Sequence, residues 1–162
     1  MNEIWDLVDR DGIKNGVKWL RENHESIPDG SYHPCVEVWV KVGDKLLLTR
    51  RHPDKSDGLK LDAPGGAVLS GESMAEGAVR ELYEEVGIKA SVEDLRLLGS
   101  YLGKKAYVLS YLLELDCLAE IHLQPSEVVG YLLVRSSELE ELADQLCEGC
   151  KNRYFMFKDQ IF

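Results

Sequence analysis

One segment, from Ser73 to Gly87, carries signals both for where a helix begins and for where it ends. Ser73 and Glu76 have the Ser-x-x-Glu spacing of a capping box, in which two side chains satisfy the first free backbone N–H groups. Gly87 is the residue type that most readily ends a helix. The segment is therefore predicted to be an α-helix, and the rest of the fold has to accommodate it.

The apolar residues of this helix gather on one face, as expected for a helix that packs against a core. At about 100° per residue, three carboxylates, Glu81, Glu84 and Glu85, share an arc about 100° wide directly beside that face. The apolar stripe consists of Ala75, Val79, Leu82 and Val86. The acids are thus expected at the edge of the core rather than on the far side of the helix.

The charge pattern of the helix favours a cation site over a solvated face. Glu81 is followed at i+4 by Glu85, a repulsive spacing that costs roughly 0.2–0.5 kcal/mol. A Lys or Arg at i+4 would relieve it, but only Lys89, beyond Gly87, stands near. Carboxylates suit hard cations such as Mg²⁺, which shares its coordination with substrate phosphates. A solvated face remains the alternative.

Two glycines, Gly65 and Gly66, come directly before the helical segment. Without a Cβ, they leave the backbone free to approach a ligand closely. The N-terminal end of a helix also favours anions. The loop therefore supports the interpretation of the acidic face as part of a ligand site.

The whole chain has 162 residues and a net charge of −10, which suits one domain with a hydrophobic core. This acidity is unfavourable for binding a nucleic-acid polymer, but an anionic small molecule can bind through a cation. No run of apolar residues is long enough to span a membrane, and no signal peptide is visible. The expected location is the cytoplasm, where the four cysteines stay thiols.

The order of predicted elements indicates a mixed α/β domain. A small hairpin is expected over residues 4–16, and two strands joined at Gly43-Asp44 are expected within residues 35–51. Residues 152–162 fit either a helix or a strand. Further strands are predicted at 95–103, 106–116 and 127–135, and further helices at 17–23 and 137–147.

The segment from Gly66 to Ile88 resembles the Nudix box, G-x5-E-x7-R-E-U-x-E-E-x-G-U, where U is aliphatic. Every specified position matches: Gly66, Glu72, Arg80, Glu81, Leu82, Glu84, Glu85, Gly87 and Ile88. The resemblance implies an α/β/α sandwich around a mixed β-sheet. It also implies one domain over residues 1–162, with 1–32 as an N-terminal extension and 33–162 as the core.

The same resemblance implies hydrolysis of a pyrophosphate bond in a nucleoside diphosphate linked to another group, or in a related diphosphate. Glu81, Glu84 and Glu85 would hold Mg²⁺ or Mn²⁺, with the Gly65 carbonyl as an extra ligand. Bound cations neutralise the diphosphate and acidify water. The family implies that either Glu81 or another carboxylate serves as the base.

Three further roles follow from the resemblance or from position. Arg80 would partner Glu72 and hold the loop against the helix. Glu127 is a second candidate for the base, because some family members use a Glu in a later loop; its alternative is an exposed residue at the start of a strand. Arg50 and Arg51 lie between a strand and the box loop, where they would either meet substrate phosphate together with Gly66 or form a solvated turn.

A weaker similarity links the N-terminal part to isopentenyl-diphosphate isomerase, which shares the fold. His33 matches one of the metal histidines of that enzyme. Its catalytic Cys, however, falls at Gly65 and another metal His at Ala67. Isomerisation is therefore disfavoured, as is a non-catalytic nucleotide-binding module, because no box carboxylate is missing. The leaving group is not decided by the box, and a homodimer is compatible with an extension of this type.

Cys147 and Cys150 form a single Cys-x-x-Cys pair without a second pair. A structural zinc site needs four converging ligands. Two free thiols are therefore the prediction for this pair.

Overall fold

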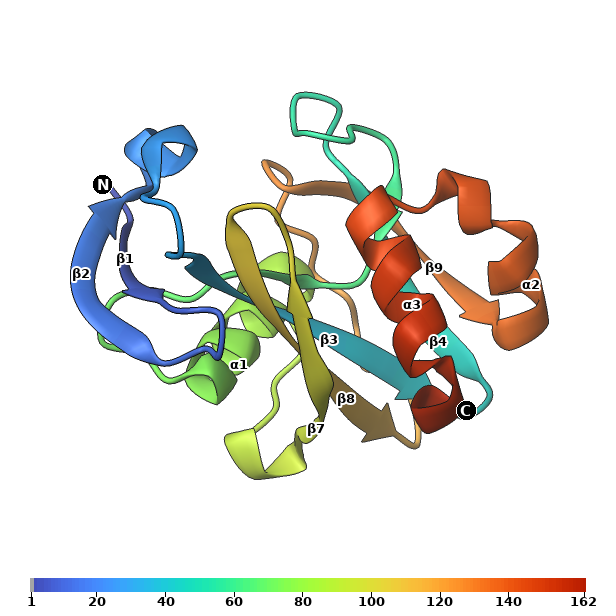
Figure 1. Cartoon of the computed structure of the whole chain (residues 1–162). Helices are drawn as coiled ribbons and strands as arrows, with labels where there is room; N and C mark the ends of the chain where they lie inside the picture. The colour runs from blue at the N-terminus through green and yellow to red at the C-terminus, as the bar shows by residue number, and fades with distance from the viewer. Residues whose placement is uncertain (1) are drawn as a thin grey trace.

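The computed structural model describes residues 2–162 and contains a two-stranded hairpin, a larger sheet and three α-helices (Figure 1). The strands are β1 (Ile4–Val8), β2 (Lys14–Leu20), β3 (His33–Val42), β4 (Lys45–Arg51), β5 (Leu61–Asp62), β6 (Gly65–Ala67), β7 (Arg96–Leu102), β8 (Ala106–Leu115) and β9 (Val128–Arg135). The helices are α1 (Met74–Val86), α2 (Ser136–Glu141) and α3 (Glu148–Ile161), with short 3-10 turns at Arg21–Ser26, Val92–Asp94 and Ala143–Gln145.

The larger sheet has seven strands and is mixed. Its main path runs β5-β4-β3-β8-β7, while β6 pairs with β3 and β9 pairs with β4. The long central strands β3 and β8 are parallel over ten residue pairs, from His33 opposite Ala106 to Val42 opposite Leu115. Every other pairing in this sheet is antiparallel. The predicted fold class, a mixed sheet between helices, is confirmed.

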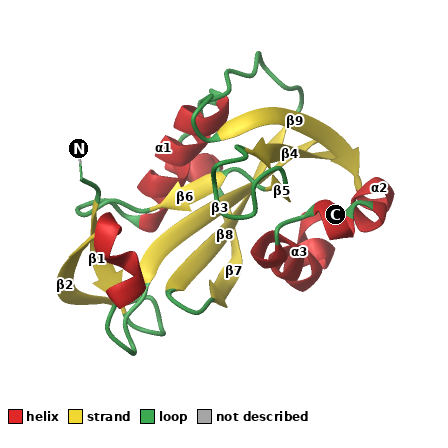
Figure 2. Cartoon of the chain, turned by 90° about the horizontal axis from the view of Figure 1, so that it is seen from above, coloured by secondary structure: helices red, strands yellow, loops and turns green. Residues whose placement is uncertain are grey.

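The two faces of the sheet pack against different helices. Figure 2 shows α1 on one side of the sheet and α3 on the other. Side chains alternate along β3, as the period of two along a strand requires: Val38 and Val40 belong to the cluster that includes α1, while Trp39 belongs to the cluster that includes α3. Helix α1 contributes Leu82 to its cluster, and α3 contributes Tyr154 to the other.

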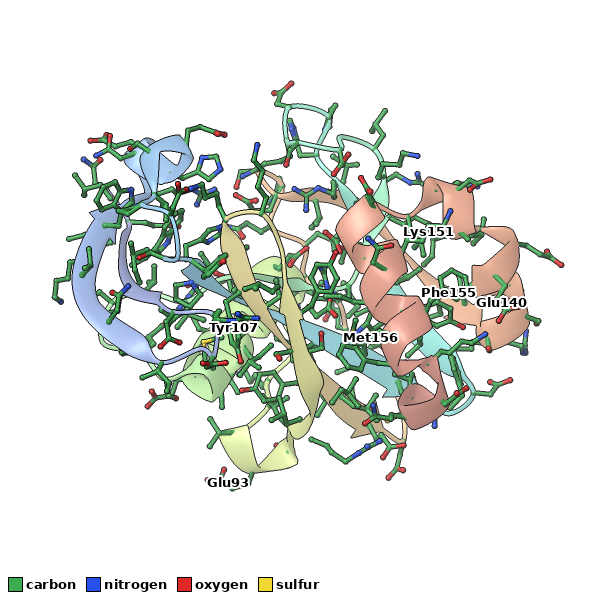
Figure 3. The ribbon with its side chains drawn as sticks, in the orientation of Figure 1. Glu93, Tyr107, Glu140, Lys151, Phe155 and Met156 are labelled. Carbon is green, nitrogen blue, oxygen red and sulfur yellow. The ribbon has the colours of Figure 1, made fainter. Side chains whose placement is uncertain are left out.

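The N-terminal hairpin lies beside the main sheet. The side chain of Asp6 in β1 accepts hydrogen bonds from Ser70 Oγ (2.7 Å) and from the Gly71 N–H (3.0 Å), which join the hairpin to the loop before α1. The Ser70 hydrogen bond is the largest reason why the pKa of Asp6 is lowered. Tyr107 of β8 lies at the hairpin turn, where a Cβ at Gly12 would come within 2.5 Å of its ring (Figure 3).

Several predicted elements are confirmed, among them the hairpin, the strand pair joined at Gly43-Asp44 and the capped helix α1. The helix predicted at residues 17–23 is wrong. Strand β2 runs to Leu20 because Trp19 pairs across the hairpin with Trp5, and a 3-10 turn follows.

The C-terminal part of the chain differs from the prediction at one boundary. The helix predicted at residues 137–147 ends early, at Glu141, and a 3-10 turn leads to an extended Leu146. The backbone N–H of Cys147 donates to the carbonyl of Leu61 (2.9 Å), so tertiary pairing with β5 interrupts the helix. The C-terminal segment from residue 152, which fitted either a helix or a strand, continues α3 as far as Ile161.

No helix in the described part of the chain combines the length and the apolar character that a membrane crossing requires.

Candidate active site

Helix α1 presents the predicted acidic residues to one end of the sheet. Its start is defined by the capping box, in which Ser73 Oγ accepts from the Glu76 N–H (3.2 Å) and Glu76 Oε2 accepts from the Ser73 N–H (2.8 Å). Its end is defined by Gly87, whose φ of 75° is left-handed. Because Leu82 is fully buried against the sheet, the rotation of the helix is set, and the acids beside Leu82 are turned toward the loop at β6.

The two glycines of β6 allow this loop to approach the helix. Gly65 and Gly66 pair with Glu37 and Val36 of β3. A Cβ on Gly65 would lie 2.2 Å from the backbone carbonyl oxygen of Val36, so glycine is required at Gly65. A Cβ on Gly66 would lie 2.6 Å from the carboxyl group of Glu81, which would have to move away from the loop.

Arg80 connects the loop to the acidic face of α1. Its Nε donates to Glu72 Oε1 (2.6 Å), and its Nη2 donates to Glu72 Oε2 (3.0 Å) and to the carbonyl of Ala67 (2.9 Å). Its Nη1 donates to Glu81 (2.7 Å) and to Glu84 (3.1 Å). Burial works against the charge of Arg80, but its hydrogen bonds to Glu72 and Glu81 raise its pKa overall. Arg80 therefore holds both the loop and the acids.

Arg80 also reduces the repulsion within the acidic arc. The helical period places Arg80 next to Glu84, four residues later, and the two side chains form an ion pair (3.1 Å). Among residues 2–162, Glu85 is the acid of the arc that has no cationic partner.

Glu85 is a buried carboxylate, with 8% of its surface exposed. Its Oε1 accepts from Thr49 Oγ1 (3.1 Å) and its Oε2 accepts from the Gly65 N–H (2.9 Å). Burial raises the pKa of Glu85 to about 8, although the Gly65 hydrogen bond opposes the shift. Burial also raises the pKa of Glu81, against the opposing effect of Arg80. A nearby positive charge would stabilise the ionised form of both carboxyl groups.

Two connected hollows face these carboxylates. The main cleft has a volume of about 540 Å³, and the inner cavity has a volume of about 40 Å³. The inner cavity exceeds the space that one water molecule needs. It is lined by Arg51, Gly65, Glu81, Glu85, Gln124 and Glu127. Glu84, whose side chain is 47% exposed, lines the main cleft instead, as do Gly65, Gly66 and Glu81.

The structure brings Glu127 and Arg51 to the site but leaves Arg50 outside it. Glu127 lines both hollows, and its Oε1 accepts from Lys55 Nζ (2.6 Å). Arg51 also lines both, and its Nη1 donates to Asp62 Oδ2 (2.9 Å). The Nη1 of Arg50 instead donates to the carbonyl of Leu59 (2.7 Å), and within residues 2–162 Arg50 lines neither hollow.

Sequence reasoning missed the wall of the main cleft that comes from the N-terminal part. Trp5 stacks on His33, with ring centroids 4.4 Å apart, and Arg21 and His24 stand nearby in the same wall. The alternation of β1, which buries Trp5 and Leu7, is the signal that would have indicated an inward-facing Trp5.

A thiol also reaches the main cleft. Cys35 lies on β3, opposite Ala67 of β6, and its Sγ is 3.2 Å from His33 Nδ1. Burial raises the pKa of Cys35 to about 12 and lowers the pKa of His33 to about 4, so the pair is neutral. The sequence comparison with the isomerase, which found no thiol at Gly65, did not anticipate this one from the neighbouring strand.

Comparisons with known proteins identify the family and the fold of the chain. The family model of the NUDIX domain matches residues 31–153. An uncharacterised Nudix hydrolase of Listeria monocytogenes is 30% identical over 145 residues, which cover 86% of this chain and 84% of the relative. The 8-oxo-dGTP diphosphatase of Escherichia coli is 44% identical over 54 residues, which cover 33% of this chain and 42% of the relative.

Among solved structures, the DR0079 protein of Deinococcus radiodurans has a TM-score of 0.75 at 24% identity. The superposition covers 96% of this chain and 99% of that protein, which establishes a shared fold. The match of the family model over most of the chain and the Listeria relative establish more than a fold. The chain belongs to the Nudix hydrolases, a family of pyrophosphohydrolase enzymes.

Proposed function

We propose that this chain hydrolyses the pyrophosphate bond of a nucleoside diphosphate linked to another group, or of a related small diphosphate, with Mg²⁺ or Mn²⁺ as its cation. The observation that carries the proposal is the convergence of Glu81, Glu85 and the Gly65–Gly66 loop around the inner cavity. Two buried carboxylates with raised pKa values border a space of about 40 Å³ at the edge of a much larger cleft.

The residues fit a divalent cation. Glu85 is buried without a cationic hydrogen-bond partner among the described residues, and oxygen ligands suit Mg²⁺. We assign Glu81, Glu84 and Glu85 as the protein ligands, with the Gly65 carbonyl as a further one. When bound, the cation neutralises the diphosphate and acidifies water.

The other residues have positioning and proton-transfer roles in this proposal. Arg80 holds the loop against α1 through its hydrogen bonds to Glu72 and to the carbonyl of Ala67. Glu81 and Glu127, both at the inner cavity, are the two candidates for the base that takes the proton of the attacking water. Glu127 accepts a hydrogen bond from Lys55 Nζ (2.6 Å) and Glu81 accepts one from Arg80 Nη1 (2.7 Å), so each candidate is held by one cationic side chain. Arg51 and the backbone at Gly66 would contact phosphate, and the position of Arg50 gives no support for that role.

The setting of the site is also proposed. Residues 1–32 form an extension of the 33–162 core, supported by the wall that Trp5 and Arg21 contribute to the cleft. A cytoplasmic location and a homodimer remain predictions, as does the absence of a nucleic-acid polymer among the partners, which the net charge of −10 supports.

A panel of diphosphates tests the proposal. The purified chain is incubated with Mg²⁺ or Mn²⁺ and with nucleoside triphosphates, dinucleotides, ADP-sugars and isopentenyl diphosphate, and phosphate is measured after phosphatase coupling. We expect cation-dependent cleavage of at least one compound. Titration calorimetry without Mg²⁺ binding at millimolar concentration, together with no cleavage across the panel, would contradict it.

One arm of the panel addresses the isomerase alternative. Cys35 and His33 in the cleft are the observation that keeps it under test, whereas Gly65 and Ala67 speak against it. Conversion of isopentenyl to dimethylallyl diphosphate at an ordinary enzymatic rate would replace hydrolysis as the proposed reaction.

A further inference from the structure

A cluster of metal-type ligands lies away from the acidic face of α1, where β5 meets the start of α3. Among the described residues, Asp62, Cys147 and Cys150 each offer one ligand atom, and these atoms all lie within 4.8 Å of one another. We propose that these three side chains bind a thiophilic divalent cation, Zn²⁺ by its chemistry, at a site separate from the carboxylate site on α1.

The backbone brings the three residues together from distant parts of the chain. Leu61 of β5 forms a parallel bridge with Leu146, and the N–H of Cys147 donates to the carbonyl of Leu61 (2.9 Å). This pairing sets Asp62 beside Cys147. Cys147 is the N-cap of α3, so Cys150 returns in the first turn of the helix, on the same side as Cys147.

The spacing of the ligand atoms is close to that of a zinc site. With Zn–S bonds of about 2.3 Å in a tetrahedron, two sulfur ligands lie about 3.8 Å apart. Side-chain adjustments of about 1 Å or less therefore gather the cluster around an ion. The Cys-x-x-Cys spacing itself is the one that recurs in zinc sites.

An unsatisfied oxygen in the cluster is an independent indication of a ligand. Asp62 Oδ1 is buried and has no hydrogen-bond partner within residues 2–162, although Oδ2 accepts from Arg51. Buried polar atoms are nearly always satisfied, and a bound ion is one of the recognised explanations for an exception. Cys147 and Cys150 are buried as well, at 6% and 0% exposure.

The surrounding charges suit a thiolate site. Two thiolates and a carboxylate bring three negative charges, so a divalent cation leaves one unbalanced. Arg51, whose Nη1 donates to Asp62 Oδ2 (2.9 Å), supplies a balancing charge, and Arg153, which pairs with Glu37, lies 3.9 Å from Asp62 Oδ1. Binding releases the two thiol protons to solvent, as metal binding by cysteines requires.

Space for entry and for a fourth ligand is present. A cleft of about 440 Å³ is bordered by Asp62, Cys147 and Arg153, which leaves room for water at the remaining position. Soft sulfur ligands select zinc over Mg²⁺, which prefers oxygen. Zn²⁺ would tie the start of α3 to the strand that precedes Gly65.

Cobalt spectroscopy tests this site independently of catalysis. The full chain is reduced, freed of metal and titrated with Co²⁺, because Co²⁺ in a thiolate site gives a near-ultraviolet charge-transfer band that the carboxylates of α1 cannot produce. We expect the band with wild-type protein and its loss on adding one equivalent of Zn²⁺. Absence of the band in the folded, reduced wild-type chain overturns the proposal without any variant.

Matched cysteine variants locate the band. Cys147→Ser and Cys150→Ser are each expected to remove it, while Cys117→Ser, at an exposed cysteine elsewhere, retains it. Asp62→Asn is expected to weaken Zn²⁺ binding at least tenfold, as measured by competition with a chromophoric chelator, and circular dichroism checks the fold of every variant. A band that survives Cys150→Ser but disappears in Cys35→Ser contradicts the assignment.

Discussion

Two buried carboxylates, on opposite faces of the central sheet, differ in what compensates them. Glu37 faces α3 at 2% exposure and accepts hydrogen bonds from Arg153 Nε (2.5 Å), Ser110 Oγ (2.5 Å) and Trp39 Nε1 (2.9 Å). Glu85 faces the site at 8% exposure, and its donors within residues 2–162 are neutral, a hydroxyl and a backbone N–H.

The difference separates a structural acid from an acid available to a ligand. Burial raises the pKa of Glu37, and Arg153 opposes that shift. Burial likewise raises the pKa of Glu85, to which no arginine in the described part of the chain is hydrogen-bonded. Burial also opposes the charge of Arg153, but Glu37 and Asp62 raise its pKa. The ion pair between Glu37 and Arg153 holds α3 to the sheet, whereas the carboxyl group of Glu85 borders a cavity.

The largest expected effect is a loss of hydrolytic activity on substitution of Glu85, the acid that borders the cavity. Glu85→Gln is expected to lower kcat/KM by about 10²–10⁴-fold, since it removes a cation ligand. Stability in the absence of metal should stay equal or rise, because a buried carboxyl group that favours the neutral form is replaced by a neutral amide. Phosphate-release kinetics and thermal melting measure the two quantities. Glu81→Gln should lower kcat/KM in the same way. A Glu85→Gln variant that loses stability but keeps activity would contradict the distinction between Glu85 and Glu37.

The second prediction concerns stability at the other acid. Arg153→Met leaves Glu37 buried without its cation, and removal of one partner of a buried pair costs about 3–5 kcal/mol of unfolding free energy. Urea denaturation measures this loss. The double variant with Glu37→Gln should recover part of it, because the uncompensated charge is gone. A loss below about 1 kcal/mol in the single variant would mean that Arg153 does not compensate the buried charge of Glu37, and the contrast with Glu85 would disappear.

The third prediction uses pH in the absence of divalent cations. The folded pKa of Glu85, about 8, lies above its ordinary value of 4.5, so the unfolded chain releases this proton first as pH rises. Its contribution to stability is complete below about pH 4.5 and is lost as pH rises through about 8, with a slope no steeper than about 1.4 kcal/mol per pH unit.

The difference in unfolding free energy between wild type and Glu85→Gln isolates this contribution, since His33, with its pKa lowered to about 4, contributes in the opposite direction to both proteins. A difference that does not change between pH 5 and pH 8 would show that Glu85 is ionised throughout.

The smallest expected effect comes from a third glutamate on α1. Glu76 lies on the exposed side of the first turn and serves the capping box. Glu76→Gln is expected to cost about 1 kcal/mol or less and to leave kcat/KM within experimental error. Equal loss of activity in Glu76→Gln and Glu85→Gln would break the distinction between the acid arc and the rest of the helix.

Much of the site could be predicted from local sequence. The helix boundaries at Ser73 and Gly87 depend on contacts within four residues, which a short motif specifies completely. The position of the acids beside the apolar stripe follows from the helical period alone, and Leu82 and Glu85 are indeed both buried.

Other features could not be predicted because they depend on pairing between distant segments. Trp5 and Cys35 reach the cleft only because the hairpin docks on the loop before α1 and β3 pairs with β6. The boundary before α3 lies at Cys147 because β5 captures Leu146 in an extended conformation. Nothing in the local sequence of residues 137–147 indicates that pairing with β5 wins over a longer helix, because Leu61, the partner of Leu146, lies more than eighty positions earlier in the chain.

The sequence by itself determined the helix, its caps, the alternation of the central strands and the set of three carboxylates that share one arc. Only the tertiary structure decided that Glu85 is buried with no cationic partner among residues 2–162, and that Asp62 meets Cys147. The physical reason is the range of the interactions. Periodicity and capping act over one or two turns, whereas desolvation and pairing of a charge depend on every segment that packs around it.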